Sequence, residues 1–69
     1  MANKIREFRR EAKMSQEKLS ALSGLSRPFL STVESGYAKP TIEKAIAIAK
    51  ALGRTLDEVF TDEEDNEPT

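Results

Sequence analysis

With 69 residues, no cysteine and no histidine, the chain can form one small domain without disulfides, thiolate metal sites or the commonest general base. Its formal net charge of −1 conceals an asymmetry, because residues 1–60 carry all 11 Lys and Arg against seven acidic residues, whereas residues 61–69 carry five acidic residues and no base. No apolar run approaches the ~18 residues of a membrane-spanning helix, and the first residues form no signal peptide. We therefore expect a cytoplasmic, non-enzymatic protein that needs no cofactor and contacts no membrane.

The first helix is expected over about residues 3–13. Ile5, Phe8 and Ala12 recur at helical spacing and form one apolar face. Asn3 precedes this face and is a suitable N-cap, because its side chain can accept a hydrogen bond from a free N–H of the first turn.

Two further helices are predicted over residues 16–23 and 27–35, joined by a very short turn. Gly24 suits the left-handed C-cap position of the first of them. A three-residue link that starts with glycine makes two helices cross steeply. This is the arrangement of a helix-turn-helix unit, whose second helix enters the major groove of DNA. The expected N-caps are Ser15 and Ser26, and the residues expected to face the core are Leu19, Leu22, Leu30 and Val33.

Two final helices complete a predicted all-α fold. The longer one spans residues 42–52 between the N-cap Thr41 and Gly53, and the shorter one begins with the capping-box sequence at residues 55–58. No stretch alternates in hydropathy as a half-buried strand does. The apolar stripe of the longer helix is expected to comprise Ile42, Ala45, Ile46, Ala49 and Leu52, with Ile48 at its margin.

The acidic segment at residues 61–69 is expected to lie outside the folded domain, which we place at residues 1–60. It has no apolar residue apart from Pro68, so it has nothing to bury and is predicted to be disordered. Such a tail most often keeps an end of the chain solvated. Two alternatives are that it folds back on the basic body and competes with DNA, or that it binds a protein partner.

The order of these motifs resembles the Cro/CI-type (XRE) family of phage and bacterial regulators. The resemblance covers about residues 3–60 without a gap. It implies a five-helix, lambda-repressor-like domain whose second and third helices form the helix-turn-helix, and the function of a small, sequence-specific transcriptional regulator, expected to be a repressor. The matching segments are Ser15-Gln16-Glu17-Lys18-Leu19, Gly24-Leu25-Ser26-Arg27, Leu30 to Gly36, Pro40-Thr41, Ile48 to Gly53 and Leu56 to Phe60.

The resemblance also implies where double-stranded DNA binds. Gln16 matches a glutamine that touches a phosphate and supports the recognition helix, and Tyr37 and Lys39 lie in a loop that follows the DNA backbone. Residue chemistry agrees for Arg27, because arginine to guanine is the commonest specific base contact, and for Thr32, whose methyl suits that of thymine. The positions that face the groove are Ser26, Arg27, Pro28, Ser31 and Thr32.

Two groups of residues are expected to serve the protein rather than the DNA. Arg9 and Glu34 match an ion pair that ties the first helix to the end of the recognition helix. Ile48, Val59 and Phe60 are a candidate homodimer patch, preferred over the alternative that they complete a thin core. The reason is that a two-fold symmetric dimer matches a palindromic operator.

Some positions depart from the family pattern or stay ambiguous. Pro28 stands where many relatives carry a polar side chain, and Ser20 stands where alanine is usual, with its hydroxyl expected to bond back to its own helix. Phe29 is equally compatible with packing against the second helix and with an apolar contact to DNA. Tyr37 is expected to anchor its loop with the hydroxyl outward, rather than to stack on a base.

Other functions remain open at this point. An antitoxin would combine DNA binding with a protein partner, and the flexible acidic tail could fold on that partner. A controller protein of a restriction–modification system is an alternative within the DNA-binding class.

Overall fold

The structure, a computed structural model, describes residues 3–61. The acidic tail predicted to be disordered spans residues 61–69 and, apart from Thr61, lies outside the described residues. Within residues 3–61 there are five helices and no strand, so the predicted all-α fold class is confirmed. The helices are α1 (Ile5–Glu11), α2 (Gln16–Ser23), α3 (Arg27–Glu34), α4 (Ile42–Leu52) and α5 (Leu56–Val59).

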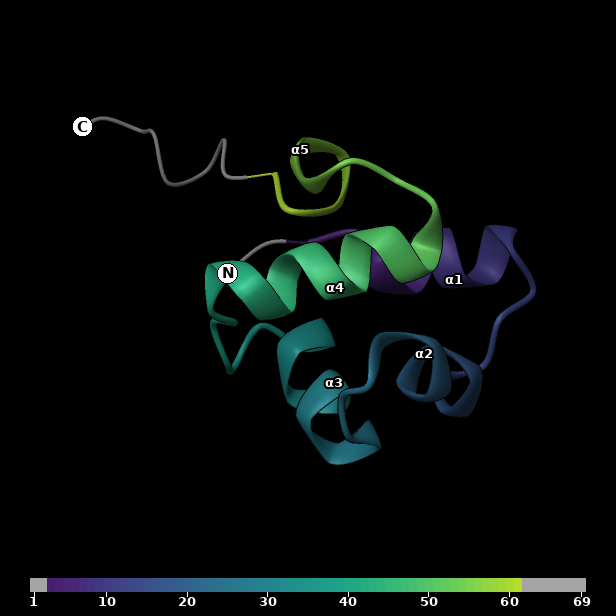
Figure 1. Ribbon diagram of the computed structural model, residues 1–69, viewed down its shortest axis with the longest axis horizontal. Helices are drawn as coiled ribbons and strands as arrows, with labels where there is room; N and C mark the ends of the chain where they lie inside the picture. Colours follow the sequence, from purple (N-terminus) through teal and green to yellow (C-terminus); the bar gives the residue numbers. More distant parts are fainter. Residues whose placement is uncertain (1–2, 62–69) are drawn as a thin grey trace.

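The longest helix, α4, is the centre of the arrangement (Figure 1). In this view α5 lies above α4, the pair α2 and α3 lies below it, and α1 lies beside its C-terminal end. The main packing pairs are α1 with α4, α2 with α4, α4 with α5, and α2 with α3. The helix-turn-helix unit therefore occupies the end of the domain opposite α5, where α3 can present one face to solvent.

One buried cluster holds all five helices together. Leu19, Leu30 and Val33 are buried as predicted, and Ile5 joins them from α1. Burying side chains of this size stabilises the fold by about 1.5–3 kcal/mol each relative to leaving them exposed. The complete cluster is Ile5, Leu19, Leu30, Val33, Ala45, Ile48, Ala49, Leu52, Val59 and Phe60.

The buried face of α4 differs from the predicted stripe. Ile48 is completely buried rather than marginal, whereas Ile42 is 63% exposed and Ile46 is 44% exposed. The buried positions are Ala45, Ile48, Ala49 and Leu52, a helical stripe rotated relative to the expected one. Neighbours on three sides, α1, α2 and α5, select this stripe, and the sequence of α4 alone does not reveal them.

The predicted dimer patch is wrong in its residues. Ile48 and Val59 are fully buried and Phe60 is 7% exposed, so all three complete the core of a single chain. A chain this small has a thin core, so the short helix α5 is needed to cover it, and the apolar residues at its end are buried there.

Two smaller predictions are also wrong. Leu22 is 52% exposed, because α2 buries only Leu19 fully and turns Leu22 toward solvent. Ala12 is exposed because α1 ends at Glu11, two residues earlier than expected, and the chain then bends through Lys13, whose φ is 55°.

Most of the helix ends follow the predicted capping. Ser15, Ser26 and Thr41 each accept a hydrogen bond from the backbone N–H three residues later, at 3.0, 3.2 and 3.3 Å. The capping box of α5 is present. Asn3 is not the N-cap of α1, because the helix begins at Ile5 and Lys4 occupies that position. The described part of the chain contains no helix with the length and hydropathy needed to cross a bilayer.

Candidate nucleic-acid interface

The turn between α2 and α3 is held by hydrogen bonds at both of its ends. Gly24 has a φ of 76°, and its N–H donates to the carbonyl of Ser20 at 2.9 Å. The Ser20 hydroxyl donates to the carbonyl of Leu25. The expectation that Ser20 bonds back to its own helix is therefore wrong, since the hydroxyl reaches forward into the turn. This contact fixes α3 relative to α2.

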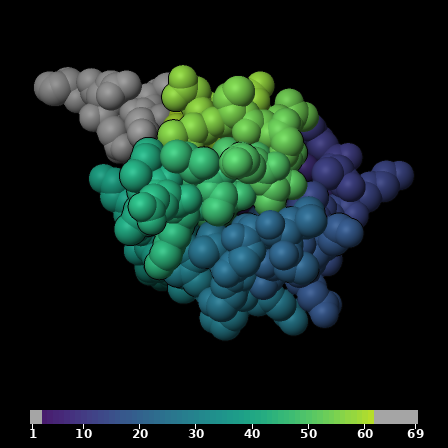
Figure 2. Space-filling view, viewed as in Figure 1, coloured from purple at the N-terminus to yellow at the C-terminus, as the bar shows by residue number. Residues whose placement is uncertain are grey.

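The exposed face of α3 carries most of the residues expected to contact DNA. Arg27, Pro28, Ser31 and Thr32 are all exposed, as is the N-cap Ser26. The opposite face of the same helix holds Leu30 and Val33 in the core. In Figure 2 the residues of α2 and α3, coloured blue to blue-green, form one continuous surface at the end of the molecule away from α5.

A hollow lies where the two helices begin. Its volume is about 340 Å³ and it is lined by Gln16, Arg27 and Pro28. Gln16 opens α2 and Arg27 opens α3, so the N-terminal ends of both helices meet here. Backbone N–H groups and the positive end of the helix dipole at such termini attract anions. The structure therefore brings together Gln16, which is predicted to contact a phosphate, and Arg27, which is predicted to contact a base.

The loop after α3 places Lys39 and Tyr37 in solvent. The backbone N–H groups of Tyr37 and Ala38 donate to the carbonyl of Thr32 at 3.0 and 3.1 Å, which holds the loop against the end of α3. The Tyr37 side chain is 90% exposed, so the expectation that it anchors the loop is wrong. Its ring is instead available to a ligand.

Phe29 belongs to the packing of the domain. Its side chain is partly buried and contacts the core cluster, and the Lys44 ammonium lies 4.9 Å from the ring centroid. The ring therefore joins α3 to α4. Of the two possibilities for Phe29, packing within the domain is the one that the structure supports.

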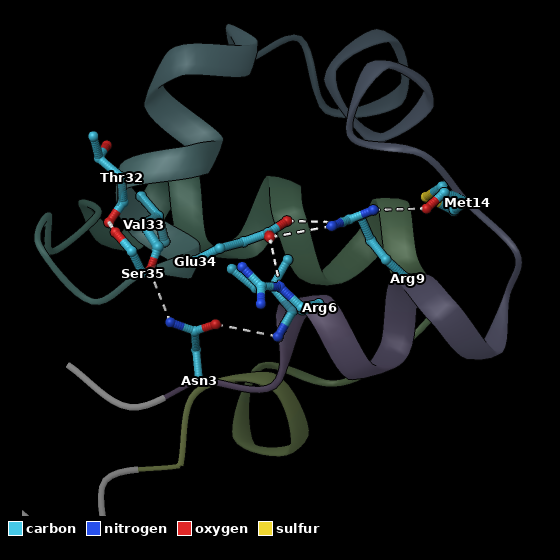
Figure 3. Close-up of polar contacts among 9 residues, drawn as sticks. Asn3, Arg6, Arg9, Met14, Thr32, Val33, Glu34 and Ser35 are labelled. Carbon is cyan, nitrogen blue, oxygen red and sulfur yellow. Dashed lines mark hydrogen bonds and ion pairs between the residues drawn. The ribbon is translucent and has the colours of Figure 1, made fainter.

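An ion-pair network locks the end of α3 to α1 (Figure 3). Arg9 Nε donates to Glu34 Oε2 at 2.7 Å, and Arg9 Nη2 donates to Glu34 Oε1 at 3.2 Å. Arg9 Nη1 also donates to the carbonyl of Met14, at 2.9 Å. Arg6 approaches the same carboxylate at 3.7 Å. The expected Arg9–Glu34 pair is present, and the Glu34 side chain is only 1% exposed.

Asn3 supplies a second tie that sequence reasoning missed. Its side-chain Nδ2 donates to the carbonyl of Val33 at 2.8 Å, and its Oδ1 accepts from the N–H of Ile5 at 3.2 Å. One amide thus bridges the start of α1 and the end of α3, as Figure 3 shows. No local sequence signal marks this contact, because it joins residues 30 positions apart.

The exposed face of α3 and the loop after it offer hydrogen-bond donors and positive charge. Within residues 3–61 no group of three or more histidine, cysteine, aspartate or glutamate side chains is placed to hold a metal ion. Arg27 at the start of α3 and Lys39 in the loop after it supply exposed cations. Such a face can bind a rigid polyanion and present a helix to it.

Comparison with known proteins identifies this arrangement. A family model described as helix-turn-helix matches residues 5–59, the segment that contains all five helices. The chain belongs to this helix-turn-helix family. The resemblance expected from the sequence is therefore confirmed.

Relatives cover nearly the whole helix-turn-helix chain. The uncharacterized HTH-type transcriptional regulator YgzD of Bacillus subtilis is 36% identical over 66 residues, which are 96% of this chain and 100% of that protein. The control protein C.SmaI of Serratia marcescens is 33% identical over 61 residues, 88% of this chain and 73% of its own. The crystal structure of the restriction-modification controller protein C.AhdI from Aeromonas hydrophila matches with a TM-score of 0.78 at 35% identity, covering 83% of this chain and 86% of that one.

Proposed function

We propose that this helix-turn-helix protein is a transcriptional regulator that binds duplex DNA sequence-specifically as a homodimer and acts as a repressor. One observation carries the proposal: α3 exposes a row of side chains that can contact DNA, while its opposite face is fixed in the core. A recognition helix must be held rigidly if its side chains are to meet base edges in register.

The geometry supports distinct roles for the residues of this surface. Gln16, in the hollow where α2 begins, contacts a phosphate, and Lys39 contacts another from the loop after α3. These contacts position the protein without reading sequence. Arg27, one residue after the N-cap of α3, reaches a guanine in the major groove, and Ser31 and Thr32 contact the neighbouring bases.

The homodimer uses a groove that shares only Phe60 with the predicted patch. A groove of about 230 Å³ is lined by residues of the loop before α4, of α4 and of α5, and exposed Ile42 lies in it with Ile46 one turn further along. Two copies related by a two-fold axis can bury these exposed apolar side chains against each other. The lining residues are Lys39, Pro40, Ile42, Ala45, Leu56, Asp57 and Phe60.

A reporter assay tests the direction of regulation. The DNA upstream of the protein's own gene is fused to a reporter, and expression is compared between cells with the protein, with the Arg27→Ala variant, and without it. The proposal predicts lower expression with the protein than without it, and relief of that repression by Arg27→Ala. Equal expression in all three strains, or higher expression with the protein, would contradict repression of its own gene.

A controller protein of a restriction–modification system is the second candidate function. It is favoured by the similarity to C.SmaI and C.AhdI, which are controller proteins by name. The test is to measure transcripts of any restriction endonuclease or methyltransferase genes beside this gene, with and without the protein. A change in these transcripts would support the controller function, and unchanged transcripts or the absence of such genes would reject it.

A further inference from the structure

The exposed side of α3 divides into two rows of different chemistry. Arg27, Ser31 and Ser35 follow one another at intervals of four residues and form a polar row. Pro28 and Thr32 are also four residues apart and form the adjacent row, one turn of helix from each other. All five side chains belong to exposed residues, so both rows can meet the groove.

The Thr32 hydroxyl is already engaged within the helix. Thr32 Oγ1 donates to the carbonyl of Phe29 at 2.7 Å, which folds the oxygen back over the preceding turn. The Thr32 carbonyl is also occupied, since it accepts from the N–H groups of Tyr37 and Ala38 and from the hydroxyl of Ser35. With its hydroxyl proton committed, Thr32 offers its γ-methyl to a ligand.

Pro28 completes an apolar surface beside this methyl. Its ring bears no hydrogen-bond donor and stands exposed in the first turn of α3, where the missing backbone N–H causes no loss. The second row therefore offers a ring and a methyl where a base-reading helix often offers amides or charges. The apolar group on the major-groove edge of a base pair is the C5-methyl of thymine.

We propose that Pro28 and Thr32 determine sequence specificity by reading thymine C5-methyl groups, beside a guanine contacted by Arg27. This inference rests on the proposed function, because it requires α3 to lie in the major groove. On this inference Pro28 and Thr32 distinguish one base pair from another by shape and by burial of an apolar methyl group, and not by hydrogen bonds.

The probe is a duplex selected by the wild-type protein from a library of random 20-base-pair sequences. In the selected duplex each thymine of the half-site is then replaced by uracil, which differs only by lacking the methyl. We expect at least one position at which uracil weakens binding by about fourfold, the value of one buried methyl-sized group. Uracil placed outside the half-site serves as the control and should change nothing.

Two variants assign the effect to Thr32. Thr32→Ser keeps the hydroxyl that bonds Phe29 and removes the methyl, so it should bind the thymine duplex about fourfold more weakly and lose the distinction between thymine and uracil. Thr32→Val keeps a methyl in this place and should retain the distinction. The corresponding variant Pro28→Ala should weaken binding to the thymine duplex in the same way at a neighbouring position.

The outcomes separate this inference from the proposed function. If selection enriches a sequence but uracil binds as tightly as thymine at every half-site position, the methyl-reading inference is overturned and sequence-specific binding stands. The inference would also be overturned if Thr32→Ser and Pro28→Ala both preferred thymine over uracil as strongly as the wild type does. If selection enriches no sequence, the proposed function itself fails.

Discussion

Glu34 has two arginines for partners and almost no contact with solvent. Its side chain is 1% exposed and pairs with Arg9 at 2.7 Å, while Arg6 lies 3.7 Å away. The pair joins α1 to the last residue of the recognition helix. A buried ion pair adds little stability over an apolar substitute, but removal of one partner leaves the other charge unpaired.

We therefore predict that Glu34→Ala lowers the free energy of unfolding by about 3 kcal/mol, because Arg9 is left partly buried without its carboxylate. Urea denaturation followed by circular dichroism measures the loss. The matched control is Glu11→Ala, which breaks the exposed pair with Arg54 and should change the free energy by no more than about 0.5 kcal/mol. Equal losses in the two variants would contradict a structural role for the Arg9–Glu34 pair.

At the DNA surface, Arg27→Ala is expected to weaken operator binding by about 1–3 kcal/mol and to relax discrimination at one base pair. Fluorescence anisotropy with duplexes that differ at single positions measures both effects. The matched variant Gln16→Ala should weaken binding to all duplexes alike, since it removes the proposed phosphate contact. If Arg27→Ala also weakens all duplexes equally, Arg27 holds a phosphate and the base-reading assignment is wrong.

Among the structural elements, the turn between α2 and α3 depends on one backbone conformation. Gly24 has a φ of 76°, and a Cβ added there would meet no atom within 4 Å, so any penalty comes from the backbone alone. Gly24→Ala should lower the free energy of unfolding by about 1–2 kcal/mol. Gly24→Asn should lose less, because asparagine tolerates the left-handed region. Urea denaturation distinguishes the two, and an unchanged stability for Gly24→Ala would contradict the strained turn.

The short helix α5 gives an acid-dependent contribution to stability. The pKa of the Glu58 carboxyl lies below its ordinary value of 4.5, chiefly because the carboxylate accepts a hydrogen bond from the backbone N–H of Thr55. Desolvation raises this pKa, whereas the Thr55 hydroxyl and the positive charge of Arg54 lower it further. Because the folded pKa is the lower one, this stabilisation is complete above pH 4.5 and disappears as the pH falls through the folded pKa.

Glu58→Gln should therefore remove part of the loss of thermal stability on acidification, since glutamine keeps an acceptor for Thr55 but does not titrate. Melting temperatures measured for both proteins between pH 7 and pH 3 test this. The two curves should converge toward acid pH. Parallel curves over the whole range would mean that Glu58 does not contribute to the pH dependence.

Helix ends were more predictable than helix faces. Serine and threonine caps at Ser15, Ser26, Thr41 and Thr55 are local signals, and α2 and α4 have the predicted bounds. The buried face of α4 depends instead on the positions of three other helices, and for this reason the burial of Ile48 and the exposure of Ile42 were not foreseen.

At the candidate site too, local sequence signals were predictive, whereas contacts between distant residues were not. The resemblance to the family marked Gln16 and Arg27, and the structure places both in one hollow. The contact of Asn3 with Val33 was not predictable, because a side-chain amide bound to a distant carbonyl leaves no pattern in the sequence. The forward reach of the Ser20 hydroxyl to Leu25 likewise depends on the geometry of the turn.

At the scale of the whole molecule, the proposed homodimer predicts that the measured mass rises with protein concentration and that this rise requires the groove beside α4. The double variant Ile42→Lys, Ile46→Lys should shift the protein to monomer in sedimentation and weaken operator binding, because two charges replace exposed apolar side chains. Leu22→Lys is the matched control, since Leu22 is 52% exposed and lies outside the groove. A dimer that survives the double variant would place the interface elsewhere.

Sequence-specific DNA recognition is tested most directly by a salt titration of binding to the DNA upstream of the protein's own gene, beside a scrambled duplex of equal length. Sequence-specific recognition by α3 predicts that the native duplex binds about 10³-fold more tightly or better, with the preference kept as salt rises. Equal and steeply salt-dependent binding to both duplexes would contradict specific recognition of this DNA. Binding to neither would indicate that the helix-turn-helix serves as a scaffold for a protein partner.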